Sequence, residues 1–154
     1  MMIPTRLFPN DTSLPQVLDL IRDNFAYMDR IIDPPSSIHT LTQFDLTAAP
    51  SELWTIGLPV IACLILTPKP LGLYIGKLTV AEKHRGQGLA QALIDQADSR
   101  ARALGLTHLE LQTRIELVAN QAAFAAMGFI ETDRTAHKGH DRPTAITYQR
   151  KVLP

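Results

Sequence analysis

A strand, a glycine-containing turn and a helix follow one another between Leu78 and Leu104, and this succession constrains the fold most. The apolar strand ends near Val80, and a short polar connection leads to Gly86 and Gly88. The first turn of a helix leaves backbone N–H groups unpaired, and the helix dipole favours an anion there. Because glycine has no Cβ, a phosphate can approach the main chain closely. The stretch is therefore a candidate phosphate-binding loop.

Two common phosphate-binding motifs do not fit this stretch. The dinucleotide fingerprint requires a third glycine three residues after Gly88, where this chain has Gln91. The P-loop requires Gly-Lys followed by Ser or Thr, and no such run is present here.

The helix after the glycines is the clearest element in the sequence. Its apolar positions recur at helical spacing, while polar residues cover the opposite side. The apolar stripe comprises Leu89, Ala90, Leu93, Ile94, Ala97, Ala101 and Leu104. Gly105 stands where a left-handed residue commonly ends a helix. We predict a helix over 89–104 and then an alternating strand over 108–112, and the strand–helix–strand order indicates a right-handed crossover.

The N-terminal part predicts an edge strand and two helices. Residues 1–7 have a weak edge-strand pattern, and apolar spacing from Leu14 predicts a helix to about Met28. Pro34 and Pro35 stop that helix, and a second one is expected over 39–46, capped by Ser37 or Thr40. Segment 33–37 is either a connector between the helices or a loop that faces a substrate.

Three strands then follow as an antiparallel meander. They are expected at 53–56, 60–66 and 71–80, with a turn at 67–70 before the last one. The middle run is almost continuously apolar, which is typical of a strand buried on both faces.

The C-terminal part predicts one more helix and two strands. Asn120 is placed to cap a helix that Gly128 ends, and a strand begins at Phe129. Residues 135–143 have the composition of a loop, and 144–152 form the last strand. The predicted order β-α-α-β-β-β-α-β-α-β-β indicates a mixed α/β (α+β) fold with a largely antiparallel sheet, in a single domain over 1–154.

Composition narrows the classes of partner and the compartment. The formal net charge of the 154 residues is zero, which argues against a nucleic-acid-binding surface as the main function. No apolar run approaches the length of a membrane span, and the N-terminus lacks a secretory pattern. The single cysteine, Cys63, fits a reducing compartment, and its apolar neighbours predict an inert buried thiol. We therefore expect a cytoplasmic protein without nucleic-acid or membrane partners.

The glycine loop carries a resemblance to a known family. The run Arg85-x-x-Gly88-x-Ala90 resembles the acyl-CoA loop of the GNAT N-acetyltransferase superfamily. The usual pattern there is Gln or Arg, two residues, Gly, one residue, and then Gly or Ala.

A second motif strengthens this resemblance. The run Asn120-x-x-Ala123-Phe124-x-x-x-Gly128-Phe129 is similar to the family's C-terminal motif, in which an Asn opens a helix that ends in Gly-Phe. The two motifs lie in the family's order with a strand between them. The predicted element order also matches the GNAT fold over essentially the whole chain.

The resemblance implies acetyl-CoA as cosubstrate, with no metal. Main-chain groups of Leu78, Thr79 and Val80 would pair with the pantetheine arm, which lies like an added strand in a split sheet. The pyrophosphate would be held by amides of the loop, namely Arg85, Gly86, Gln87, Gly88, Leu89 and Ala90. Asn120 and Phe124 would contact the cofactor from the second helix of the motif pair.

The implied reaction is direct attack of a primary amine on the thioester in a ternary complex. The backbone N–H of Leu78 is the expected donor to the oxyanion. Many family members have a tyrosine four residues before the Gly-Phe pair as general acid, and this chain has Phe124 there. Tyr74, Tyr148 and His140 are therefore candidate acid or base residues.

Further candidates are weaker. His137 shares the late loop with His140 and is a second candidate base, as are Glu110 and Glu116. Two histidines and Asp141 in one loop also permit a metal site, but three potential ligands alone do not define one.

Two alternatives to an enzyme stay open at this stage. Phe124 is compatible with a non-catalytic acyl-CoA sensor or interaction module of the same fold. An unrelated phosphate-binding domain could also carry a similar glycine loop. For the enzyme, the expected partner is a small-molecule or peptide amine, and the resemblance allows a homodimer.

Overall fold

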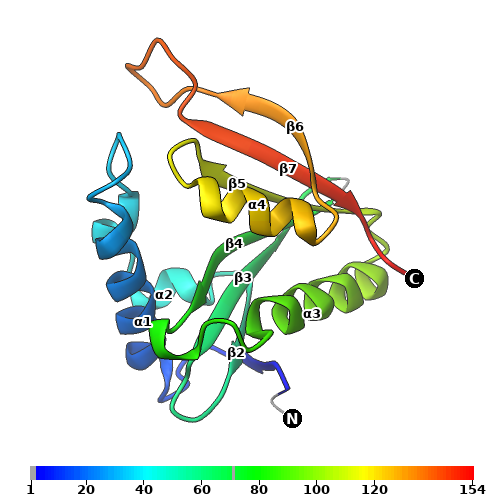
Figure 1. Ribbon diagram of the computed structural model, residues 1–154. Helices are drawn as coiled ribbons and strands as arrows, with labels where there is room; N and C mark the ends of the chain where they lie inside the picture. The colour runs from blue at the N-terminus through cyan, green and yellow to red at the C-terminus, as the bar shows by residue number, and fades with distance from the viewer. Residues whose placement is uncertain (1–2, 71) are drawn as a thin grey trace.

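The computed structural model describes residues 3–70 and 72–154, which fold around a seven-stranded sheet (Figure 1). The strands are β1 (Thr5–Leu7), β2 (Glu52–Ile56), β3 (Ala62–Pro68), β4 (Gly72–Val80), β5 (His108–Arg114), β6 (Ile130–Thr135) and β7 (Ala145–Lys151). Their order in the sheet is β1-β2-β3-β4-β5-β7-β6. Every neighbouring pair is antiparallel except β4 and β5. The expected mixed α/β class with a largely antiparallel sheet is confirmed.

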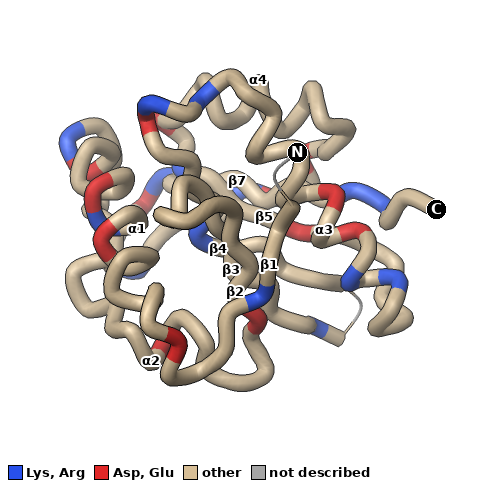
Figure 2. The backbone as a smooth tube through the Cα atoms, turned by 90° about the horizontal axis from the view of Figure 1, so that it is seen from below, with Lys and Arg blue, Asp and Glu red and all other residues tan. Residues whose placement is uncertain are grey.

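Helices cover both faces of the sheet, as Figure 2 shows from below. They are α1 (Leu14–Met28), the 3-10 turn η1 (Ser37–Thr40), α2 (Gln43–Leu46), the 3-10 turn η2 (Glu82–His84), α3 (Leu89–Leu104) and α4 (Val118–Ala126). The N-terminal helices α1 and α2 lie on one side, and α3 lies on the other. No helix within the described ranges is long and apolar enough to cross a membrane.

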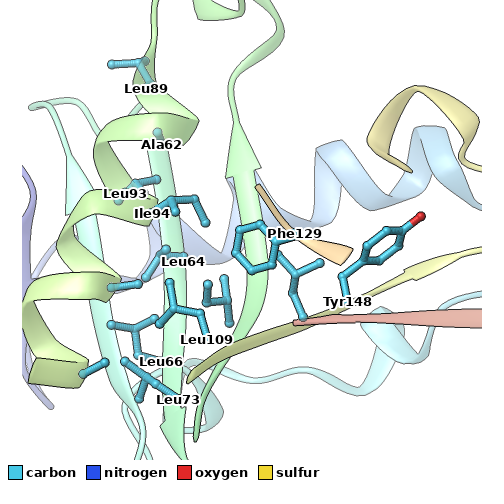
Figure 3. Packing of buried hydrophobic residues seen from close by; sticks show 14 of the residues in the cluster. Ala62, Leu64, Leu66, Leu73, Leu89, Leu93, Ile94, Leu109, Phe129 and Tyr148 are labelled. Carbon is cyan, nitrogen blue, oxygen red and sulfur yellow. The ribbon is translucent and has the colours of Figure 1, made fainter. Parts of the chain in front are cut away.

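Alternation along β3 produces the two cores. Ala62, Leu64 and Leu66 pack against α3, as Figure 3 shows. Cys63 and Ile65, which point to the opposite face, pack with the apolar residues of α1. A strand with two apolar faces can hold helices on both sides, which is why this run is almost continuously apolar.

The boundaries of α3 follow from its two flanking glycines. Gly88 precedes the helix with φ 79°, and Gly105 ends it with φ 71°, so both have a left-handed conformation that glycine adopts without strain. The N–H of Gly105 donates to the carbonyls of Ala101 and Arg102. The helix predicted from the sequence is confirmed at both ends.

The sheet splits between β4 and β5. Among the described residues, Gly72–Ile75 of β4 pair with His108–Leu111 of β5, and the two strands are not paired after Ile75 and Leu111. Beyond this point β4 continues to Val80 beside β3, whereas β5 continues to Arg114 beside β7. Figure 1 shows the two halves of the sheet diverging.

A β-bulge lies in β4 at the point of divergence. Cys63 of β3 pairs with Thr79, but Ile65 pairs with Gly76, so Lys77 and Leu78 together oppose Leu64. Lys77 takes the left-handed conformation, with φ 54°. Such an extra residue shifts the alternation of side chains by one position.

Several expected boundaries were wrong. The single helix over 39–46 is instead η1 followed by α2, because Leu41 is extended and Thr42 starts α2 with a capping box to Asp45. The turn expected at 67–70 begins later, since Thr67 and Pro68 still pair with β4. The strand β3 also begins at Ala62 rather than at the predicted residue 60.

The start of the last helix also differs from the prediction, and part of two predicted strands cannot be compared with the structure. Asn120 is not the cap of α4, because Leu117 precedes the helix and Asn120 lies in its first turn. The predicted strands over 1–7 and 71–80 include Met1, Met2 and Leu71, which lie outside the described residues.

A buried ion pair joins α3 to β7, and its loss should destabilise the fold. Arg150 donates to both carboxylate oxygens of Asp98, at 3.1 and 2.9 Å, and both side chains are buried. Asp98→Ala leaves the guanidinium buried without its counter-ion, so we expect a loss of about 3–5 kcal/mol in the free energy of unfolding. Urea denaturation followed by circular dichroism measures it.

Asp95→Ala on the same helix is the matched control, because this carboxylate is exposed and, among the described residues, accepts a hydrogen bond from Gln91 alone. We expect its effect to stay within about 0.5 kcal/mol. Equal destabilisation by the two substitutions would contradict the role assigned to the ion pair.

Candidate functional site

Two adjoining cavities occupy the split between β4 and β5. The larger has a volume of about 760 Å³ and the smaller about 340 Å³, both in the range of small-molecule sites. They share a wall made of Met28, Leu78, Leu117, Asn120 and Phe124. Ligands in the two cavities would therefore meet beside the bulge in β4.

The larger cavity opens onto the glycine loop. The loop and the start of α3 contribute His84, Arg85, Gly86, Gly88, Leu89, Ala90 and Gln91 to its lining. Residues of α1 and the first turns of α4 form the opposite wall. The Arg85 guanidinium donates to Asn24 Oδ1 at 2.9 Å, which ties the loop to α1.

The loop leaves backbone donors available to a ligand. No side chain caps α3, and its first turn carries no acidic residue. A Cβ built on Gly86 or on Gly88 would have no neighbour within 4 Å. The N-terminal N–H groups of α3 and the dipole of its 16 residues thus face an open space that suits an anion.

The smaller cavity has a mixed lining with three titratable nitrogen-bearing side chains. Phe25 of α1 and Phe124 of α4 give it apolar walls. Lys77, Arg114 and His137 also line it, together with Tyr74.

Burial and neighbouring charges shift the pKa of several of these groups. The pKa of Tyr74 is raised by burial and then by Glu110, so its phenol stays protonated near neutral pH. The pKa of Lys77 is lowered by burial and then by Arg114. The pKa of His137 is lowered by burial, then by Arg114 and by His140, which favours the neutral imidazole.

Most of the predicted cofactor-binding residues come together around the larger cavity. Those that line it are Leu78, Val80, Arg85, Gly86, Gly88, Leu89, Ala90, Asn120 and Phe124. Thr79 does not line this cavity, because strand alternation turns its side chain towards the core that contains Cys63 and α1. Its hydroxyl donates to the carbonyl of Lys77 at 2.9 Å. Gln87 is exposed and does not line the cavity either.

Of the three predicted acid or base residues, Tyr74 lines a cavity, whereas Tyr148 and His140 do not. Tyr74 lines the smaller cavity. Tyr148 is buried, with its ring centroid 6.1 Å from that of Phe124, and lines neither cavity. His140 also lines neither cavity, and its Nε2 lies 3.7 Å from Asp33 Oδ1. Its neighbour His137 lines the smaller one instead.

The remaining candidates also differ in position. Glu116 lines the larger cavity, and its Oε2 accepts a hydrogen bond from the Asp33 N–H at 3.2 Å. Glu110 lines neither cavity. Within residues 3–70 and 72–154, no group of three or more His, Cys, Asp or Glu side chains is arranged to hold a metal ion.

Sequence reasoning missed two cations of the smaller cavity. Lys77 lies in a strand pattern, and only the bulge directs it towards Phe25, with Nζ 5.3 Å from the ring centroid. Arg114 is brought to the cavity by the extension of β5, two residues beyond the predicted strand end. Neither feature has a local sequence signal.

The comparisons with known proteins agree with this geometry. The family model described as "Acetyltransferase (GNAT) family" matches residues 14–129. No curated protein sequence gives a significant match. The match covers most of the chain and agrees with the mixed α/β fold. The chain belongs to the acetyltransferase (GNAT) family, a class of N-acetyltransferase enzymes.

Solved structures with a similar fold span the whole chain. The ribosomal-protein-S18-alanine N-acetyltransferase from Escherichia coli is 19% identical, with a TM-score of 0.72 and coverage of 99% of this chain and 94% of that one. A GNAT family acetyltransferase from Elizabethkingia anophelis with acetyl-CoA bound is 18% identical, with a TM-score of 0.71 and 97% coverage of both chains. An aminoglycoside 6'-N-acetyltransferase complexed with coenzyme A is 11% identical, with a TM-score of 0.76 and coverage of 99% and 98%.

The only cysteine should be unreactive in the folded protein. Cys63 is fully buried, and burial raises the pKa of its thiol to about 12. Since the thiolate is the reactive form, we expect no reaction with Ellman's reagent under native conditions and one equivalent after denaturation. Rapid labelling of the native protein would contradict the assigned burial.

Proposed function

We propose that this enzyme transfers an acetyl group from acetyl-CoA to a primary amine of a small molecule or peptide, within a ternary complex. The observation that carries the proposal is the arrangement of two cavities that meet at Leu78, one of which opens onto the glycine loop. Such a pair of cavities can hold a donor and an acceptor at the same time, and proximity of this kind accelerates a bimolecular transfer.

The residues present fit acetyl-CoA. The uncapped start of α3 and the open space beside Gly86 and Gly88 suit its pyrophosphate. The unpaired edge of β4 after Ile75 suits the amide groups of the pantetheine arm, which can add to a strand edge. Asn120 and Phe124 line both cavities and would contact the cofactor near its reacting end.

The proposed acetyl transfer requires a hydrogen-bond donor to the thioester carbonyl oxygen. Acetyl-CoA supplies the acyl group as a thioester, so a C–N bond to the amine forms as the C–S bond breaks and the thiolate takes up a proton. We assign the Leu78 N–H to the carbonyl oxygen that gains negative charge. Leu78 lies in the bulge, outside the paired register of β3 and beyond the end of pairing with β5, which supports this role.

We assign the proton-donating role to Tyr74 and the proton-accepting role to His137. Tyr74 has a phenol that stays protonated and lines the cavity. His137 has a depressed pKa, and its Nδ1 contacts the Thr144 hydroxyl. A neutral imidazole can accept a proton from an ammonium, which has no lone pair until it loses one.

A non-catalytic acyl-CoA sensor is the second candidate function. It is favoured by Phe124, which lines both cavities and has no hydroxyl at the position where the resemblance implies a tyrosine. Its ring packs against Phe129 and Tyr148, at centroid distances of 6.3 and 6.1 Å. The cytoplasmic location, the single domain and the homodimer stay predictions.

Substitution of the glycine loop tests cofactor binding. Gly88→Leu places a side chain in the space assigned to the pyrophosphate, so we expect acetyl-CoA to bind at least about tenfold more weakly in calorimetry. Gly105→Leu is the matched control, because Gly105 has a similar φ of 71°, no neighbour within 4 Å of a built Cβ, and no place in either cavity. Equal weakening in both variants would contradict the placement.

A measurement of turnover distinguishes an acetyltransferase from a non-catalytic acyl-CoA sensor. Thiol release from acetyl-CoA with a library of amines should show sustained turnover, whereas a sensor would bind acetyl-CoA without it. For one accepted amine, Tyr74→Phe should lower kcat by about a hundredfold or more, as loss of a general acid does.

Tyr148→Phe is the control for this substitution, since it removes the same hydroxyl from a tyrosine that lines neither cavity. We expect nearly unchanged kcat there. The assignment of Tyr74 fails if Tyr148→Phe has the larger effect on kcat.

A further inference from the structure

The bulge in β4 directs a lysine into the smaller cavity. Leu73 and Ile75 belong to the core against α3, so continued alternation would put Lys77 into that core as well. The extra residue gives that place to Leu78, which packs against the same core. Lys77 is thereby turned towards Phe25 of α1, on the cavity side.

The ammonium of Lys77 has no counter-ion among the described residues. Throughout residues 3–70 and 72–154, the structure gives it a cation–π contact with Phe25 and neither a hydrogen bond nor an ion pair. Burial and Arg114 both disfavour its charged form, and both lower its pKa. A half-buried ammonium in this situation is stabilised by an anion supplied from outside the chain.

Arg114 contributes a second positive charge from the opposite strand. Its guanidinium donates to the carbonyls of Pro34, at 2.5 Å, and Pro35, at 3.4 Å, which fixes it at the cavity wall. Burial lowers the pKa of Arg114, and the charges of Glu116, Asp29 and Asp33 offset that shift only in part. None of these three carboxylates lines the smaller cavity.

The lining of the smaller cavity is complementary to an anion in one further way. Among the described residues, it includes no Asp or Glu. An anion bound between the two cations would therefore meet no carboxylate in the wall of the cavity.

The geometry points to an anion-binding subsite between Lys77 and Arg114, which selects acceptor amines that also carry a carboxylate or another compact oxyanion. This inference rests on the proposed function, because it names the class of acceptor for that same site. The volume of about 340 Å³ suits an acceptor of amino-acid size. Charge-assisted hydrogen bonds from the two cations would orient its amine.

Matched acceptors test the subsite directly. Each of a panel of amino acids is compared with its own C-terminal amide, with kcat/KM expressed per unprotonated amine. O-Phosphoethanolamine against ethanolamine forms the second arm, which distinguishes a phosphate from a carboxylate. We expect the anionic member of at least one arm to be favoured by about tenfold to a hundredfold, as for hydrogen bonds to charged groups.

A second measurement does not depend on turnover. Calorimetry compares the binding of N-acetylated amino acids with that of their amides to the wild-type protein. It needs no variant, and both members of each pair lack an ionisable amine. The same preference for the carboxylate is expected in this binding measurement.

Substitutions at Lys77 test whether the preference for anionic acceptors arises at this subsite. Lys77→Met should reduce the preference to about twofold or less, and Lys77→Arg should retain it, because Arg keeps the charge. Lys151→Met is the control, since it removes an exposed lysine that lines neither cavity.

The outcomes separate the two proposals. Amines acetylated without preference for the anionic member overturn the subsite and leave the proposed function intact. No turnover with any amine, together with carboxylate binding that Lys77→Met abolishes, supports the subsite and overturns the proposed function. Equal binding of acids and amides by the wild-type protein overturns the subsite, whatever the turnover.

Discussion

The short parallel pairing of β4 and β5 is the constraint on which the site depends. Four pairs of described residues join these strands. After Ile75 and Leu111, β4 pairs with β3 alone and β5 with β7 alone. Backbone groups on a strand edge need partners, and a cofactor with amides of its own can supply them. The same divergence separates the glycine loop, at the end of β4, from Arg114, at the end of β5. A longer pairing would close both cavities and remove the unpaired edge.

The β-bulge makes this opening asymmetric. It places Leu78 against the core of α3 and Lys77 on the side of α1, so one backbone irregularity serves both cavities. An uninterrupted β4 would bury a lysine among leucines, at a cost that few folds tolerate. The left-handed φ of Lys77 is a local strain that the surrounding ladder maintains. Bulges next to functional sites commonly redirect a side chain in this way.

The sequence alone predicted the parts of the fold that have local signals. The helix over 89–104, with glycines at both ends, and the parallel β4–β5 pair follow from spacing and from the crossover. The glycine loop also has a local signal, because its residues are consecutive, and most of them line the larger cavity. The two candidate bases His137 and His140 illustrate the limit, because the sequence did not distinguish between them. Both lie in one loop, and only its fold brings His137 to the cavity. Lys77 and Arg114 depend on a bulge and on a strand extension, which pairing partners decide.

The residues shared by the two cavities have a consequence for the size of the transferred group. Leu78, Asn120 and Phe124 line both cavities. Under the proposed function, the acyl group and the amine would meet at these three residues, so each carbon added to the acyl group would take volume from the acceptor. Acyl-chain length and acceptor size would then be coupled, and a substitution that changes the size of the Phe124 side chain would alter both together.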